Sequence, residues 1–126
     1  MASELTTLEI KARDQFNAFI RLRDRDKPCI YCGGGQHEPN AAHYFTKNRF
    51  SGYMFNENNV FGACAVCNNL DNQEAFRANM IFRIGIEAVE KLEAGANSNR
   101  FRKFARYELK EIAEIYKLKI KELNAD

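Results

Sequence analysis

The sequence contains no long apolar run, and this absence excludes one class of protein at the start. No stretch of the 126 residues approaches the ~18 consecutive apolar residues that a membrane-spanning helix needs. The first residues, MASELTTLEIK, also lack the apolar segment of a secretory signal peptide. We therefore expect a protein that works in the cytoplasm and does not contact a membrane.

A strong excess of charge of either sign is also missing. The chain carries 19 basic and 17 acidic residues, a formal net charge of +2 at pH 7. With 45% hydrophobic and 29% charged residues, the composition is that of a globular protein rather than a disordered one. No repeat, low-complexity tract or linker interrupts it, and 126 residues suffice for one ordinary domain but not for two. Residues 1–126 are therefore expected to form a single domain.

Basic residues nevertheless gather in two segments. Residues 20–27, IRLRDRDK, carry four cations against two aspartates. Residues 97–107, NSNRFRKFARY, contain no carboxylate, and their cations are Arg100, Arg102, Lys103 and Arg106. Such clusters are typical of surfaces that bind nucleic-acid phosphates, and equally of solvated helix faces, so charge alone leaves both interpretations open.

Hydrophobic spacing predicts a helix followed by an irregular β centre. Apolar residues recur at three- and four-residue steps over 5–22, which predicts a helix that ends before Pro28. Two β-like runs follow, at 41–45 and 59–63, and a polar, aromatic loop separates them. This centre is expected to be compact and poor in regular structure.

Helical spacing returns in the second half of the chain. One helix is expected over 70–83, and after a glycine a shorter helix is expected from Ile86 until it stops near Gly95. A last helix is expected over 100–123, capped at its start by Asn97 or Ser98. The predicted fold class is therefore α+β, with helices on both sides of a small β centre.

Four cysteines in two pairs form the strongest motif. Cys29-x-x-Cys32 and Cys64-x-x-Cys67 are separated by the 31 residues of 33–63. In a reducing compartment, pairs at this spacing favour metal ligands over disulfides, and two such knuckles complete the tetrahedron of a zinc ion. Four sulfur ligands leave no open coordination position, so this zinc is expected to be structural. Four unrelated buried cysteines, or a redox pair, agree less well with the spacing.

Only two histidines are present, and both lie between the cysteine pairs. His37 follows a glycine-rich turn, where a surface position is expected. His43 enters an apolar run, where a histidine is ordinarily a hydrogen-bonded structural residue. Two asparagines change that expectation: Asn59 precedes the second β-like run, and Asn68 directly follows Cys67. This order of side chains is that of the ββα-metal nucleases.

The chemistry of phosphodiester hydrolysis explains the choice of these side chains. The reaction requires a water nucleophile, a base that takes its proton, and a cation that neutralises charge on the phosphate. The neutral imidazole of His43 is a suitable base near pH 7. An amide oxygen such as that of Asn68 is a suitable ligand for Mg²⁺ or Mn²⁺.

At these residues the sequence resembles the HNH superfamily, and most closely the NinG/Rap recombination proteins of phages. The similar segments are spread over most of the chain: 20–24, 28–30, 42–44, 55–59, 64–68, 83–85, 89–93 and 108–110. The zinc-flanked centre is also similar to that of phage endonuclease VII, a Holliday-junction resolvase. The resemblance implies a zinc-stapled ββα-metal core at 28–83, between an N-terminal helix at 1–27 and C-terminal helices at 84–126.

The resemblance also implies an activity. The protein would be an HNH-type, metal-dependent DNA endonuclease that cuts branched recombination intermediates such as Holliday junctions. His43 would be the general base, Asn68 a ligand of the catalytic Mg²⁺ or Mn²⁺, and Asn59 the residue that orients His43. Such a protein, encoded by a phage or prophage, would act in the cytoplasm of a bacterial host.

Two positions near the base differ from the family pattern. Many HNH enzymes carry Asp or His directly before the base, where this chain has Ala42. NinG-like proteins tend to carry a histidine three residues before the base, where this chain has Asn40. Asn40 is therefore a further candidate ligand of the catalytic ion, with Asp71 or Asn72 as alternatives. Weak binding of the ion is the remaining alternative.

Several residues are candidates for contacts with DNA. Lys47 and Arg49 follow the base and are expected to contact the backbone beside the scissile bond. The basic segment defined above, with Arg100, Arg102, Lys103 and Arg106, is expected to hold a second arm of the DNA. Aromatic residues of the same loop could stack on an unpaired base or pack over the zinc core: Phe50, Tyr53 and Phe55.

Three hypotheses about assembly and function remain open at this level. The apolar helices at both ends exceed what the small β centre needs for cover, so a homodimer is one hypothesis. The main rival to the nuclease is a non-catalytic, zinc-dependent DNA-binding module, in which His43 is structural and Asn68 caps a helix. A zinc ribbon that binds proteins is a third interpretation.

Overall fold

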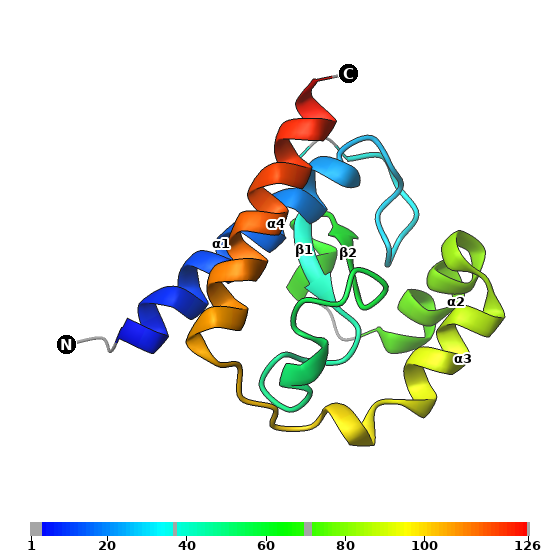
Figure 1. Cartoon of the computed structure of the whole chain (residues 1–126). Helices are drawn as coiled ribbons and strands as arrows, with labels where there is room; N and C mark the ends of the chain where they lie inside the picture. Colours follow the sequence, from blue (N-terminus) through cyan, green and yellow to red (C-terminus); the bar gives the residue numbers. More distant parts are fainter. Residues whose placement is uncertain (1–3, 37, 70–71, 126) are drawn as a thin grey trace.

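The computed structural model describes residues 4–36, 38–69 and 72–125, and in these residues four α-helices surround a two-stranded antiparallel sheet. Figure 1 shows α1 and α4 side by side, the sheet in the middle, and α2 with α3 on the other side. The α+β class predicted from the sequence is confirmed. The elements are α1 (Glu4–Arg23), β1 (Asn40–His43), β2 (Val60–Ala63), α2 (Gln73–Ile84), α3 (Ile86–Ala94) and α4 (Arg106–Asn124).

The sheet is a short hairpin with a long connection. Asn40 pairs with Ala63 at one end, and His43 pairs with Val60 at the other. The predicted β runs are therefore confirmed to within two residues. Residues 44–59 connect the strands and include a 3-10 turn at Ser51–Tyr53.

Helices α1 and α4 cover one another. Phe16, Phe19 and Ile20 of α1 form a core cluster with Tyr116 of α4 and Val60 of β2. The Phe16 and Tyr116 rings meet edge to face, with 4.8 Å between centroids, a favoured aromatic geometry. The apolar surplus behind the dimer hypothesis is thus largely covered within one chain.

Helices α2 and α3 form the second half of the core. Phe76 and Met80 of α2 are buried in one cluster with Val89 and Leu92 of α3. The expected break between these helices is confirmed, because Gly85 separates them with a φ of +90° that glycine adopts without strain. None of the helices that the structure describes is long and apolar enough to span a membrane.

The predicted start of α2 is partly outside the described residues. Leu70 and Asp71 belong to the part of the chain that the structure does not describe. Helix α2 begins at Gln73, and Asn72 caps it by accepting a hydrogen bond from the Ala75 N–H at 3.2 Å. The side-chain oxygen of Asn72, which was considered as a metal ligand, therefore caps helix α2.

The predicted start of the last helix is wrong. Helix α4 begins at Arg106 rather than at residue 100, and Asn97 and Ser98 lie in a 3-10 turn instead of capping it. The carboxylate of Glu108 accepts the Ala105 N–H at 2.9 Å. Residues 100 and 101 lie in a turn, and residues 102–105 form a non-helical connection that is extended at Ala105.

Bonds to the long loop explain this difference. Phe101 has a φ of +52°, its N–H donates to the Arg49 carbonyl at 3.2 Å, and the Ser51 hydroxyl donates to the Arg102 carbonyl at 2.7 Å. The Phe101 N–H and the Arg102 carbonyl are consequently not available for the backbone hydrogen bonds of a helix. As a result, the basic residues before Arg106 lie against the loop that follows His43.

A buried carboxylate fastens α1 to the sheet and to α2. Asp24, at the end of α1, is fully buried and accepts hydrogen bonds from Arg23, Arg83 and the Gly62 N–H. Burial alone would raise its pKa, but these partners lower it below the ordinary value. The sequence analysis did not identify Asp24, because its role depends on partners 38 and 59 residues away.

Candidate functional site

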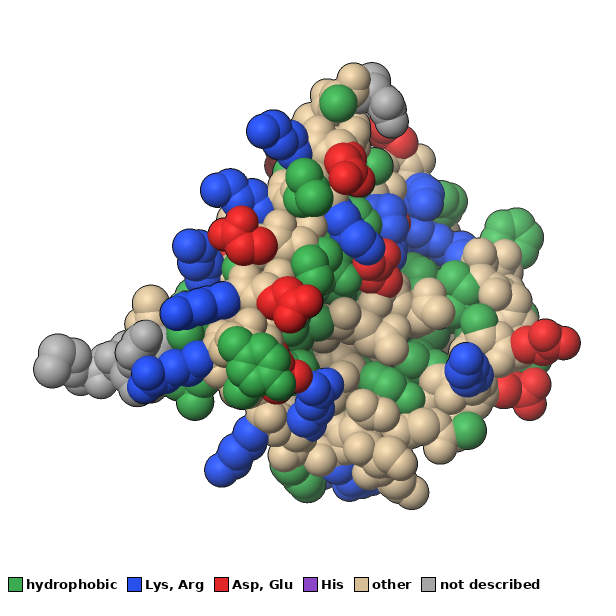
Figure 2. Space-filling model, in the orientation of Figure 1, with side chains coloured by type: hydrophobic (Ala, Val, Ile, Leu, Met, Phe, Trp, Pro, Cys, Tyr) green, Lys and Arg blue, Asp and Glu red, His purple; other side chains and the backbone are tan. Residues whose placement is uncertain are grey.

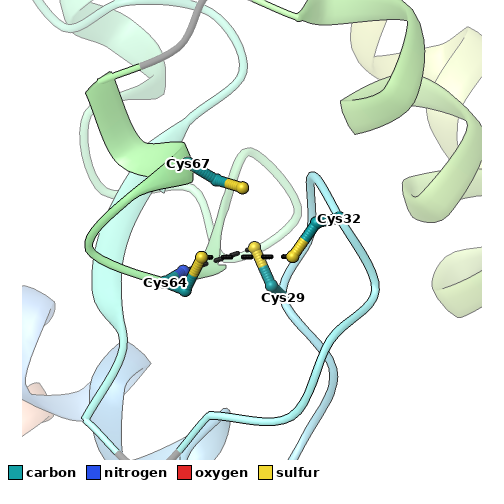
Figure 3. Close-up of side chains that lie close together, drawn as sticks. All are labelled: Cys29, Cys32, Cys64 and Cys67. Atoms are coloured by element: carbon teal, nitrogen blue, oxygen red, sulfur yellow. Dashed lines mark hydrogen bonds between the residues drawn. The ribbon is translucent and has the colours of Figure 1, made fainter.

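The four cysteines meet in one cluster. Their Sγ atoms all lie within 4.8 Å of one another, and Cys32 and Cys64 are 4.0 Å apart. Figure 3 shows the side chains of Cys29, Cys32, Cys64 and Cys67 pointing toward a common centre from two separate loops. A zinc ion with Zn–S bonds of about 2.3 Å requires sulfur atoms about 3.8 Å apart, so the cluster can hold a metal such as zinc.

Glycines and backbone N–H groups shape the first knuckle. Gly33 has a φ of +73°, and the Cys29 N–H donates to the Gly34 carbonyl at 2.9 Å, which closes the turn. The N–H groups of Tyr31 and Cys64 point at the Cys29 Sγ, at 3.4 and 3.3 Å. Such N–H···S contacts stabilise thiolates, which are the form that binds metal.

The electrostatics of the cluster favour a cation. Burial alone would raise the pKa of Cys29, but the backbone N–H groups around its sulfur lower it. The pKa of Cys67 is raised, first by its hydrogen bond with Cys64 and then by burial and the neighbouring sulfurs. A positive ion among the four sulfurs would stabilise the thiolate form of the cluster.

The cysteine cluster is joined directly to the hairpin. The Ile30 N–H donates to the Gly62 carbonyl of β2 at 3.0 Å. The second knuckle closes when the Asn68 N–H donates to the Cys64 carbonyl at 2.9 Å. This bond fixes Asn68 immediately after the last cysteine, and its side chain is exposed.

His43 is half-buried at the end of β1, and its ring is held from one side. Its Nε2 lies 3.2 Å from the Met54 carbonyl. A carbonyl only accepts, so this bond places the proton on Nε2 and leaves Nδ1 with a free lone pair. Burial lowers the pKa of His43 to about 4; the Met54 bond opposes the shift, while Lys47 and Arg13 add to it. The ring is therefore neutral at pH 7.

Asn59 supports the loop that holds His43. Its side chain is fully buried; Oδ1 accepts the Phe45 N–H at 2.8 Å, and Nδ2 donates to the carbonyls of Phe45 and Tyr53 at 3.0 and 3.3 Å. The Tyr53 carbonyl directly precedes Met54, whose carbonyl bonds His43. The Asn59 side chain thus fixes the backbone of the loop whose Met54 carbonyl bonds His43.

His43 and Asn68 line the same hollow. It has a volume of about 460 Å³, and Asn17 of α1 and Lys47 also line it. Asn40 lies elsewhere, at a separate hollow with Arg21 and other residues. The cause is the pleat of β1, since side chains three positions apart leave opposite faces of a strand. The structure brings His43 and Asn68 together and does not bring Asn40 to them.

A family model described as "Bacteriophage Lambda NinG protein" matches residues 2–126. The chain belongs to the NinG family. "Protein ninG" of Escherichia phage lambda is 40% identical over 116 residues, covering 90% of this chain and 55% of the phage lambda protein. "Protein ninG" of Salmonella phage P22 is 38% identical over 116 residues, covering 90% of this chain and 56% of that protein.

This NinG-family chain spans about half the length of the curated relatives that it matches. No solved structure matches the chain. Family membership therefore rests on sequence similarity, and the geometry of the site comes from this chain alone.

The hollow of this NinG-family chain contains residues that sequence analysis missed. Asn17, Asn48 and Gln73 contribute polar side chains to it. Asn17 directly follows Phe16 on the inner side of α1. Its position as a polar residue at the margin of the apolar stripe was the one sequence signal that could have indicated a role in the site. Among the described residues that line the hollow, none is Asp or Glu. His37, which was expected at the surface, and the alternative ligand Asp71 lie outside the described residues.

The predicted DNA-contacting cations occupy different settings. Lys47 lines the hollow, whereas Arg49 and Arg106 are exposed. Arg100 lies over the Phe50 ring at 4.8 Å, and Arg102 is paired with Glu108. Figure 2 shows Lys and Arg side chains gathered over α1 and α4 and few over α2 and α3.

The three aromatic candidates for base stacking are mostly used in packing. Tyr53 is buried, and its hydroxyl donates to the Leu92 carbonyl at 2.7 Å, so it cannot stack on a base. Phe55 packs against Phe16 and Phe104. The packing interpretation is thus correct for Tyr53 and Phe55.

Proposed function

We propose that this chain is a metal-dependent DNA endonuclease of the HNH type, in which the hollow between β1 and the second cysteine knuckle is the active site. The observation that carries the proposal is that His43 and Asn68 line one open hollow although they are distant in sequence. A single accessible site that joins a neutral imidazole to an amide oxygen agrees with phosphodiester hydrolysis.

His43 is the general base in this proposal. Its free Nδ1 accepts the proton of the attacking water, and the imidazolium that forms keeps its Nε2–H bonded to the Met54 carbonyl. A phosphate in the hollow brings negative charge to the ring and raises its pKa from about 4 toward the working pH. Lys47 contacts the same phosphate, and Asn59 keeps the loop in place.

Asn68 would hold the catalytic Mg²⁺ or Mn²⁺. When bound, such an ion neutralises charge on the phosphate and on the leaving oxygen. Asn68 fits this task because its side chain is exposed beside the hollow and has no hydrogen bond within the described part of the chain. Since no carboxylate lines the described hollow, phosphate oxygens of the substrate must supply most of the negative charge.

Branched DNA is the proposed substrate class. The support for it is the resemblance to the NinG/Rap recombination proteins, together with membership of the NinG family. Cations around the hollow are suited to reading the path of the backbone rather than base edges. A homodimer, with one site for each strand of a junction, remains part of the proposal.

A non-catalytic, zinc-dependent DNA-binding module is the second candidate. The lack of a carboxylate in the described hollow is the observation in its favour. Against it, the helix cap that this hypothesis assigned to Asn68 is provided by Asn72.

Cleavage of a labelled four-way junction separates the two candidates. The protein is incubated with the junction and Mg²⁺ or Mn²⁺, and junction binding is measured in parallel. We expect cleavage by the wild type and a loss of about 10²–10⁴-fold in His43→Ala with binding retained. His37→Ala removes the other histidine and is the matched control. Binding without cleavage under both metals would instead establish the DNA-binding module.

A further inference from the structure

We propose that Arg13, Lys47, Arg102 and Lys103 form a phosphate-binding strip that leads DNA backbone from the candidate active site toward the start of α4. This inference rests on the proposed function, which supplies the premise that the ligand is DNA. It adds Arg13, in the middle of α1, which lies outside both basic segments of the sequence.

The strip lies in a second hollow that continues the first. This second hollow has a volume of about 410 Å³, and all four cations of the strip line it. Lys47 and Asn48 line both hollows, so the two are contiguous. A backbone bound at His43 can therefore extend into the second hollow without leaving the surface.

The charge of the second hollow is mainly positive. Its lining contains the four cations of the strip and, among described residues, one carboxylate, Glu9. The pairing of Arg13 with Glu9 is long, at 4.0 Å. Lys47 and Lys103 have no ion-pair partner in the part of the chain that the structure describes. Lys47 and Lys103, which lack close counter-charges among the described residues, are suited to binding phosphates, whereas Arg102 is also paired with Glu108.

Three separate segments build the strip. Arg13 comes from the middle of α1, Lys47 from the loop after β1, and Lys103 from the non-helical connection before α4. The bond from the Ser51 hydroxyl to the Arg102 carbonyl holds that connection against the loop. The late start of α4 thus places Lys103 in the second hollow.

Two further features agree with this assignment. Arg13 and Lys47 both lower the pKa of His43, after burial, so their fields reach the first hollow. An anion there would be stabilised by the same fields. The side-chain amide of Asn48 lies in the second hollow among the cations and can donate hydrogen bonds to phosphate oxygens.

Salt dependence of DNA binding tests the strip. The probe is a labelled four-way junction, without added divalent ion, and binding by the full chain is measured from 50 to 200 mM salt. The slope of log K against log salt falls by about 0.9 for each phosphate contact removed. We expect this loss for Arg13→Gln and for Lys103→Gln, and about twice the loss for the double variant.

Two controls keep the result specific. Lys11→Gln removes a charge from the same helix, but Lys11 is exposed and two residues from Arg13, so it points to another side and should leave the slope unchanged. Arg13→Lys keeps the charge and should restore the slope. Melting curves must agree among the variants that are compared.

The outcomes separate this inference from the proposed function. Equal slopes for Arg13→Gln and Lys11→Gln would overturn the strip, even if the wild type cuts DNA. A reduced slope in a protein that cuts nothing would support the strip and overturn the nuclease. Absence of salt-dependent binding by the wild type would overturn the strip.

Discussion

Asn59 shows how a single buried amide can position a site that it does not touch. Its side chain makes three hydrogen bonds with the described residues, and all three go to the backbone of the loop after β1. Asn59→Ala removes the partner of both the Phe45 N–H and the Phe45 carbonyl, whereas the Tyr53 carbonyl keeps its bond from the Asn56 N–H, so we expect a loss of about 2–4 kcal/mol in unfolding free energy. Urea denaturation measures this loss, and Asn58→Ala, at the exposed neighbour, should cost less than about 0.5 kcal/mol. Equal costs would contradict the role given to Asn59.

The depressed pKa of His43 makes stability depend on pH. The folded state keeps the ring neutral down to about pH 4, whereas the unfolded chain protonates it near 6.5. The unfolded state thus binds more protons between these values, and stability falls as the pH falls through this window. From pH 7 to pH 5 the contribution of His43 should fall by about 2 kcal/mol.

His43→Gln isolates this contribution. Acid also weakens thiolate–metal bonds, but this effect is shared by both proteins and cancels in their difference. The unfolding free energy of the wild type minus that of His43→Gln should therefore decrease from pH 7 to pH 5. A constant difference would mean that the ring is not buried as a neutral base.

At the scale of single residues, the sequence predicted those site residues whose partners lie a short, fixed number of positions away in the chain. The four cysteines were predictable, since two residues between ligands define a knuckle, and they do meet in one cluster. Asn17 was not predictable, because it reaches the hollow only once α1 has packed beside the hairpin. Asn40 was misplaced relative to His43, because a family pattern does not take account of the pleat of this strand.

At the scale of the elements, the end of α1 packs closely against β2. A methyl group added at Gly62 would lie 2.9 Å from both the Asp24 and Pro39 Cβ atoms. The neighbours cannot move easily, because Asp24 is bound by Arg23 and Arg83. Gly62→Ala should therefore lower the unfolding free energy by about 1–3 kcal/mol in urea denaturation.

Gly35→Ala is the matched control for this junction. No heavy atom lies within 4 Å of a methyl group added at Gly35, so space should not limit it. We expect a change of less than about 0.5 kcal/mol in the same measurement. A larger loss at Gly35 than at Gly62 would contradict the close packing of α1 on β2.

The observed helix boundaries agree with the predicted ones where signals in neighbouring residues determine them. Gly85 separates α2 from α3 as expected, because the turn needs a conformation that glycine favours. The start of α4 was not predictable in this way. Residues 100–105 have helical spacing, but hydrogen bonds to residues 49 and 51 compete with the helix, and only the folded chain contains them.

At the scale of the whole molecule, the cysteine cluster belongs to the core that joins the hairpin to α2 and α3. Cys29 and Cys67 belong to the same buried cluster as Phe76 of α2 and Val89 of α3. The first knuckle is also bonded to β2 through Ile30. Loss of the metal should therefore loosen the hairpin and the α2–α3 pair together, while the α1–α4 contact has its own core.

Removal of the metal tests this coupling. Structural zinc contributes on the order of 10 kcal/mol of folding free energy, which is comparable to the whole stability of a domain of ordinary size. We expect about one zinc ion per chain, released by a chelator together with much of the helical circular dichroism signal, and recovered when zinc is added back. Cys67→Ser should behave like the chelated protein. A metal-free chain with an unchanged melting curve would mean that packing alone holds the hairpin, and that the cluster does not position His43 and Asn68.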